Sequence, residues 1–259
     1  MFRWFKRLSI YRIVRKHALP DHEWHSVTAK LPLLLMLDAT EKARLRVLTT
    51  LLIHRKVFVG SRGVEIDLRM KIIIAAQACL EILELGIDAF DGWNEIIVYP
   101  DAFIVEHNEI DEMGIVHSGS RALSGEAWQR GPVILSLDDI ERNSFHIQKG
   151  HHVILHEFAH KLDMLNGRAN GMPPLHPSMP IEAWTQSLSI AYKNLVSRAE
   201  HHHGPINPYA TTNPGEFFAV MCEYFFTAPD ILHEEYPKVY TQLKAYFRQD
   251  PLRWTMKPH

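Results

Sequence analysis

Apolar residues recur with helical spacing over the first ninety residues of the chain. The stretch at 37–58 opens with Asp38 three positions before Glu41, which is a capping box, and continues with apolar residues three or four positions apart. A second helical pattern at 64–86 stops at Gly86. The pattern therefore predicts a largely helical N-terminal region.

The periodicity then changes. Residues 93–105 and 131–137 form short runs rich in valine and isoleucine, bounded by glycine and proline, and these runs predict strands. The polar stretch at 106–130 between them predicts a loop or a hairpin. Helical spacing returns in four segments, at 150–165, 181–199, 214–227 and 235–249. Helices, a small sheet and helices again predict an α+β fold.

The first sixteen residues carry six basic residues and no acidic ones. Their apolar residues are interleaved with the basic ones, so the segment lacks the continuous apolar centre of a signal peptide. One interpretation is a flexible or core-docked helix with a solvated basic edge. The other is contact with an anionic membrane surface through residues 1–16, as a basic amphipathic helix.

The overall composition excludes several classes of protein. With 28 Lys and Arg against 30 Asp and Glu, no net field favours nucleic acid, and no basic helix-turn-helix pattern occurs. The longest apolar runs, at 31–37 and 72–80, are too short to cross a bilayer. Cys79 and Cys222 stand far apart, which excludes a disulfide scaffold and fits a reducing compartment. We therefore expect a cytoplasmic protein without direct nucleic-acid binding.

The sequence His-Glu-Phe-Ala-His at 156–160 lies within a predicted helix. Residues four apart share one face of a helix, so His156 and His160 can aim both imidazoles at a single ion. Glu157 is rotated by about 100° from His156, and it can reach a water at the metal rather than the metal itself. This pattern is typical of zinc peptidases, with two ligands and a general base.

Other histidines compete for the role of ligand. His152 lies four residues before His156, but a straight helix cannot bring three residues spread over two turns to one tetrahedral ion. A metal held by His152 and His156 would also leave no evident role for Glu157. We therefore interpret His151 and His152 as first-turn residues near solvent, and the histidines at 201–203 as a solvated helix end.

A catalytic zinc needs a third protein ligand, and the predicted helix at 214–227 supplies two candidates. Glu216 and Glu223 lie seven residues apart on one face of an otherwise apolar helix, where buried carboxylates need a cation or hydrogen-bond partners. Alternatively, Asn213 and Pro214 place Glu216 at a capping position, and Glu223 is solvated or bonds to a ligand. Spacing alone leaves the choice between the two glutamates open.

Three segments, "HEFAHKLDMLNG", "YATTNPGEFFAVMCEYFF" and "GPVILSLDDI", resemble the Mlc titration factor A family of bacterial zinc peptidases. That family is related in its catalytic region to the anthrax lethal factor protease. The likeness runs over nearly the whole chain and is weakest in the first twenty residues and at 200–206. It implies a mostly helical α+β fold with a small mixed sheet. A basic segment (1–20) and a helical region (21–92) would precede a zincin-like catalytic domain (93–259).

The resemblance also implies roles for individual residues. His156, His160 and Glu216 would hold one Zn²⁺, and Glu157 would be the general base. Tyr209, seven residues before Glu216, would be the tyrosine that stabilises the transition state. The activity implied is aminopeptidase-like hydrolysis of short peptides.

Two further features leave alternatives open. Asp163 lies on the face of the histidines and either orients one imidazole through its second nitrogen or anchors the helix end and the following loop. The strand at 131–136 is a candidate edge to which an extended peptide could add by backbone hydrogen bonds.

A second hypothesis is a binding protein that sequesters a transcriptional regulator. The resemblance implies binding to the repressor Mlc, in connection with glucose uptake by the phosphotransferase system. A non-catalytic binding protein with a zinc site is therefore the alternative to a peptidase. A purely structural zinc is disfavoured, because such sites usually close with Cys or His ligands and no suitably placed pair is evident.

Overall fold

The computed structural model describes the chain over residues 10–101, 103–110, 116–123, 125–127, 131–199 and 204–255. Residues 10–16 of the basic N-terminal segment are helical. Residues 1–9, the rest of the segment for which membrane contact is one interpretation, lie outside the described residues. The histidines at 201–203 also lie outside them.

Four α-helices follow between residues 21 and 81: α2 (Asp21–Thr28), α3 (Pro32–Leu35), α4 (Ala39–Arg55) and α5 (Leu68–Glu81). The predicted capping box begins α4, because Asp38 accepts from the Glu41 N–H and Glu41 accepts from the Asp38 N–H, both at 2.8 Å. The prediction that this helix continues through residue 58 is wrong. Val57–Gly60 forms strand β1 instead, since β-branched and aromatic side chains favour a strand and β2 offers a partner.

A four-stranded sheet has the order β1, β2 (Glu95–Tyr99), β6 (Val133–Ser136) and β5 (Gly125–Ala127). The first three strands are parallel, whereas β5 runs antiparallel to β6, so the sheet is mixed as predicted. The prediction that 131–136 forms an edge is wrong, because β6 lies between β2 and β5 in the sheet. A strand of three residues that begins with glycine carries too little alternation to be recognised in the sequence.

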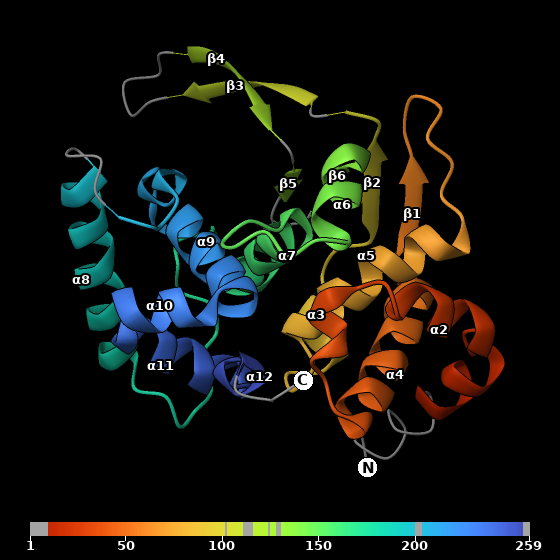
Figure 1. Ribbon diagram of the computed structural model, residues 1–259. Helices are drawn as coiled ribbons and strands as arrows, with labels where there is room; N and C mark the ends of the chain where they lie inside the picture. The colour runs from red at the N-terminus through yellow and green to blue at the C-terminus, as the bar shows by residue number, and fades with distance from the viewer. Residues whose placement is uncertain are drawn as a thin grey trace.

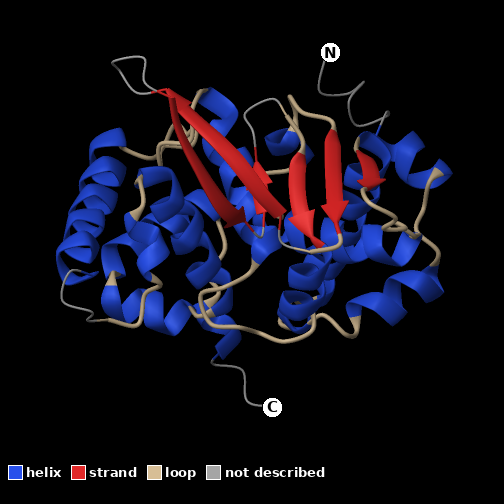
Figure 2. Cartoon of the chain, turned by 90° about the horizontal axis from the view of Figure 1, so that it is seen from above, coloured by secondary structure: helices blue, strands red, loops and turns tan. Residues whose placement is uncertain are grey.

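The stretch between β2 and β6 contains an antiparallel hairpin, β3 (Phe103–Ile110) and β4 (Val116–Leu123), which is one of the two predicted alternatives. In Figure 1 the hairpin leaves the sheet and reaches across the top of the molecule toward the side of α8 (Ile181–Ala199). Figure 2 shows the same course from above.

Two helices in the middle of the molecule, α7 (Val153–Asp163) and α9 (Pro214–Thr227), pack against each other, and α7 also packs against α5, β5 and β6 (Figure 1). The remaining helices are α6 (Leu137–Ser144), α10 (Pro229–Glu235), α11 (Pro237–Phe247) and α12 (Leu252–Thr255), with short 3-10 helices η1 (Ile87–Phe90), η2 (Met164–Asn166) and η3 (Pro208–Thr211).

One cluster of buried hydrophobic side chains runs through the fold, with members such as Trp24 from α2, Phe158 from α7 and Phe225 from α9. This cluster has members on both sides of the predicted boundary between 21–92 and 93–259. The boundary coincides with a change of secondary structure, and its role as a domain boundary stays a prediction. The α+β class, mostly helical with a small mixed sheet, is confirmed. Among the described residues, no helix has both the length and the apolar character needed to span a bilayer.

Candidate metal centre

Helix α7 starts from a tight glycine turn. Gly150 has a φ of 68°, and a Cβ at this position would overlap the ring of Tyr224. The Gly150 N–H donates to Thr227 Oγ1 of α9 at 2.8 Å. His152 then serves as the N-cap, since its Nδ1 accepts from the Leu155 N–H at 3.4 Å. The start of α7 is therefore fixed against α9.

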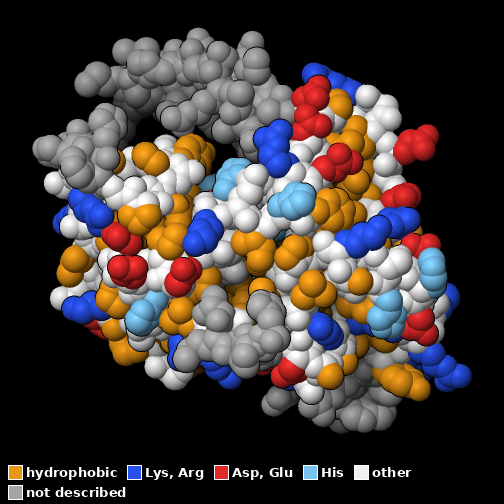
Figure 3. Space-filling model, in the orientation of Figure 1, with side chains coloured by type: hydrophobic (Ala, Val, Ile, Leu, Met, Phe, Trp, Pro, Cys, Tyr) orange, Lys and Arg blue, Asp and Glu red, His pale blue; other side chains and the backbone are white. Residues whose placement is uncertain are grey.

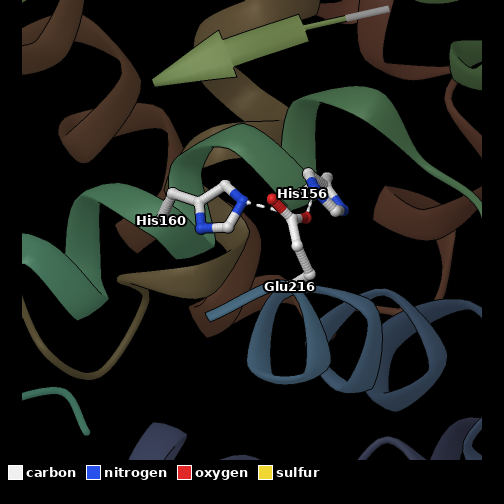
Figure 4. Close-up of side chains that lie close together, drawn as sticks. All are labelled: His156, His160 and Glu216. Atoms are coloured by element: carbon white, nitrogen blue, oxygen red, sulfur yellow. Dashed lines mark hydrogen bonds and ion pairs between the residues drawn. The ribbon is translucent and has the colours of Figure 1, made fainter. Parts of the chain in front are cut away.

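The apolar side of α7 decides where its histidines point. Ile154, Phe158 and Leu162 have no exposed surface, so the helix presents this side to the core. His156 and His160, one turn apart, consequently face α9, as Figure 4 shows.

The two imidazoles meet a carboxylate of α9. Asn213 caps that helix by accepting from the Glu216 N–H at 2.9 Å, as predicted, and this places Glu216 in its first turn. Oε2 of Glu216 lies 3.0 Å from His156 Nε2 and 3.4 Å from His160 Nε2 (Figure 4). One ligand atom from each of the three residues lies within 4.8 Å of the other two. In the part of the chain that the structure describes, no other group of metal-ligating side chains converges so closely.

The three side chains are almost buried but keep some contact with solvent. The side chains of His156, His160 and Glu216 are 12%, 9% and 17% exposed. Figure 3 shows histidine side chains at the surface near the middle of this face of the molecule. Because each of the three ligand candidates keeps some exposed surface, a small substrate group or a water can reach the cluster.

Opposite charges hold the cluster together. Burial alone would lower the pKa of His156, but the carboxylates of Glu223 and Glu216 outweigh burial and raise this pKa well above its ordinary value. For Glu216, burial favours the neutral acid, yet hydrogen bonds from His156 and His160 bring its pKa far below the ordinary value. A positive charge is thus stabilised at the point where the three groups meet.

This donor set fits a divalent metal ion. Two imidazole nitrogens and one carboxylate oxygen form the ligand set of a large class of catalytic zinc sites. Both Nε2 atoms approach the same oxygen, so all three groups could share one cation.

Comparisons with known proteins show which family the chain belongs to. The model of the family described as glucose-regulated metallo-peptidase M90 matches residues 2–248. The chain belongs to the M90 metallopeptidase family. Mlc titration factor A of Serratia proteamaculans is 38% identical over 234 residues, which cover 89% of this chain and 88% of that protein. Mlc titration factor A of Salmonella arizonae is 40% identical over 235 residues, which cover 89% of this chain and 92% of that protein. The predicted resemblance is confirmed, and an M90 protein is expected to bind a metal.

Glu157, the predicted base of this M90 chain, is 3% exposed and follows His156 on α7. Lys161, one turn further along α7, is 2% exposed, and its Nζ donates to the Gly131 carbonyl at 2.9 Å. Burial lowers the pKa of Lys161 to about 8, against the opposing attraction of Glu157. Sequence reasoning missed this lysine, although its spacing of four residues from Glu157 could have suggested a pair on one helix face. The role of Glu157 as base stays a prediction.

Tyr209 lies on η3, at the edge of the cluster. Asn207 begins η3 by accepting from the Tyr209 N–H at 3.0 Å, and the Asn207 N–H donates to the Tyr224 hydroxyl at 3.1 Å. The half-buried Tyr209 ring has its centroid 5.9 Å from that of His156. The M90 fold thus brings Tyr209 beside the predicted ligands, and its role in the transition state stays a prediction.

The prediction that His152 lies near solvent is wrong. His152 is 2% exposed, and its Nε2 lies 2.9 Å from Gln77 Oε1 of α5. Gln77 in turn donates to Ser144 Oγ at 2.8 Å. The buried contact with α5 depends on tertiary packing, which no local pattern around residue 152 reveals. Its neighbour His151 is partly exposed.

Asp163 acts as a loop anchor, which is one of its two predicted alternatives. Its carboxylate accepts from the Gly171 N–H at 2.7 Å and from the Met172 N–H at 2.8 Å. Nδ1 of His160 is buried and has no hydrogen-bond partner among the described residues, so Asp163 does not orient that ring. The carboxylate instead holds the loop that follows η2 against the end of α7.

Proposed function

We propose that the chain is a zinc-dependent peptidase with aminopeptidase-like action on short peptides. The observation that carries this proposal is the convergence of His156, His160 and Glu216 on one point, next to Glu157 and Tyr209. The three converging side chains would hold one Zn²⁺. When bound, the ion would supply Lewis-acid polarisation and lower the pKa of a water to about 7.

In this proposal, side chains of the protein transfer the proton and stabilise the negative charge that develops on the carbonyl oxygen. Glu157 accepts a proton from the attacking water and delivers it to the leaving amine. The Tyr209 hydroxyl donates to the oxyanion that forms at the scissile carbonyl, a contribution of about 2–4 kcal/mol for one well-placed donor. The buried Lys161 lies one turn after Glu157 on α7, and the attraction of Glu157 opposes the lowering of the Lys161 pKa by burial.

The test of the peptidase proposal is the isosteric variant Glu157→Gln. We expect this variant to retain zinc, because Glu157 is not a ligand, and to lose hydrolysis by about 10²–10⁴-fold, because the amide cannot take up the proton. Glu182→Gln, at an exposed position of α8, is the matched control and should behave as the wild type. Undiminished cleavage by Glu157→Gln would exclude the proposed base.

Aminopeptidase-like action is supported by the family resemblance and needs its own test. A peptide library with free N-termini should be digested from the amino end, whereas N-acetylated copies of the same peptides should resist. Addition of a chelator should stop the digestion of the peptides with free N-termini. Equal cleavage of the two libraries at internal bonds would replace the aminopeptidase proposal by an endopeptidase.

We propose as a second function that the chain binds the transcriptional repressor Mlc. Support comes from the relatives called Mlc titration factor A, which are 38–40% identical over most of the chain. A cytoplasmic location is part of this proposal, and the buried, unpaired thiols of Cys79 and Cys222 are consistent with it. If Glu157→Gln binds purified Mlc like the wild type but hydrolyses no peptide, binding and catalysis are separate activities. If neither protein binds Mlc, the second proposal fails.

A further inference from the structure

Glu223 is a buried carboxylate that the proposed reaction does not use. It lies on α9, two turns after Glu216, and is 3% exposed. Its Oε1 lies 2.8 Å from Nδ1 of His156, the ring nitrogen that points away from Glu216. The two glutamates of α9 therefore contact opposite edges of one imidazole.

The second oxygen of Glu223 has a different partner. Oε2 accepts a hydrogen bond from the backbone N–H of His152, the residue that caps α7. The partly exposed His151 also places its Nδ1 3.8 Å from this oxygen. A backbone N–H can only donate, so Oε2 is committed as an acceptor whatever happens at Oε1.

We propose that Glu223 is a positioning residue, which holds a proton on Nδ1 of His156 and thereby leaves Nε2 of that ring free to bind the metal. This inference rests on the proposed zinc function and adds a residue to it. A neutral imidazole carries its hydrogen on one nitrogen only, and an acceptor at Nδ1 selects the form whose Nε2 has the free electron pair. The same carboxylate ties the start of α7 to α9, so the ring and the helix that carries it are fixed together.

The change Glu223→Gln isolates this role because it preserves the shape and removes one acceptor. An amide has one oxygen and one NH₂ group, whereas two N–H donors face Glu223, from His156 and from the His152 backbone. If the amide oxygen faces His152, its NH₂ meets Nδ1 and selects the ring form that carries hydrogen on Nε2. If the oxygen faces His156, the buried His152 N–H meets another donor. Both arrangements oppose metal binding through Nε2.

The experiment measures zinc affinity by competition with a chelator. We expect Glu223→Gln to bind zinc about 10–100-fold more weakly than the wild type, the usual effect of removing a partner of a ligand imidazole. Glu81→Gln is the matched control: Glu81 is fully buried on the adjacent α5, and neither carboxylate oxygen has a hydrogen-bond partner among the described residues. This control should retain the wild-type affinity. Equal affinities for Glu223→Gln and the wild type would overturn the inference.

A second measurement needs no variant and guards against misfolding of Glu223→Gln. In zinc-loaded wild-type protein labelled with ¹⁵N-histidine, NMR should show His156 bound through Nε2 and protonated at Nδ1. Binding through Nδ1 would overturn the inference even if the variant were unstable. A wild-type protein that binds no zinc would instead refute the proposed function, and the positioning role would fall with it. Metal loss in Glu223→Ala but not in Glu216→Ala would make Glu223 the ligand and overturn both assignments.

Discussion

Acid should destabilise the metal-free protein through His152, a buried histidine outside the ligand set. Both of its ring nitrogens are used in the neutral form. Nε2 faces Gln77 Oε1 at 2.9 Å, so it carries the hydrogen, and Nδ1 accepts from the Leu155 N–H at 3.4 Å. Gln77 cannot reverse its amide easily, because its NH₂ donates to the Ile73 carbonyl at 3.0 Å, and a carbonyl oxygen can only accept. Protonation would break the cap and place a charge in the core.

The magnitude follows from the pKa of this side chain. Burial, reinforced by the nearby His151, lowers the pKa of His152 from 6.5 to about 3. The unfolded chain therefore binds this proton more readily, so the contribution of His152 to stability is complete above pH 6.5 and falls as the pH falls toward 3. Two pH units below 6.5, the loss amounts to about 3 kcal/mol.

The assay is chemical unfolding of chelator-treated protein at several pH values between 7 and about 4.5. The variant His152→Asn keeps a capping side chain but removes the titrating ring, so its stability should fall less steeply with acid than that of the wild type. His22→Asn, at an exposed position of α2, serves as the control and should follow the wild-type slope. If wild type and His152→Asn lose stability in parallel over this range, the imidazole is not held neutral and the reasoning is refuted.

Two other features of the fold give independent predictions. Gly150→Ala should destabilise the protein by more than about 2 kcal/mol, because a left-handed φ is costly for alanine and its Cβ overlaps the Tyr224 ring; urea unfolding measures this. A Gly150→Ala protein with wild-type stability would mean that the turn at this position relaxes freely. Cys79 and Cys222 should resist iodoacetamide in the native protein and react after unfolding, because burial raises the pKa of both thiols and denies access to them. Mass spectrometry counts the alkylated thiols, and native labelling at either position would contradict this burial.

The elements that carry the site could be predicted because their ends are marked locally. Asn213 and Pro214 predict the start of α9, and the apolar spacing around His156 predicts α7. Strand β5 could not be found, since pairing with β6 and not its own composition makes it a strand. Helical apolar spacing continues past Arg55, where α4 ends, so the pattern wrongly predicted a helix at β1. These residues form a strand because they pair with β2 in the folded chain.

Spacing in the sequence does not show which of Glu216 and Glu223 contacts the ligand nitrogens of the histidines. Residues seven apart share a helix face, so both carboxylates were equivalent candidates in the sequence. In the folded chain they differ in their partners, which are set by how α7 packs on α9. Glu216 faces Nε2 of His156 and of His160, whereas Glu223 contacts Nδ1 of His156 and the backbone N–H of His152. The burial of His152 likewise depends on Gln77, which lies on another helix.

Because two glutamates of α9 contact opposite edges of the His156 ring, the spacing between them along α9 must match the size and position of that ring. Inserting or deleting one residue between Glu216 and Glu223 would turn one carboxylate by about 100° around the axis of α9 and move it by about 1.5 Å along it. His156 could then engage one glutamate but not both. The spacing of seven positions between Glu216 and Glu223 is therefore required for both contacts with His156.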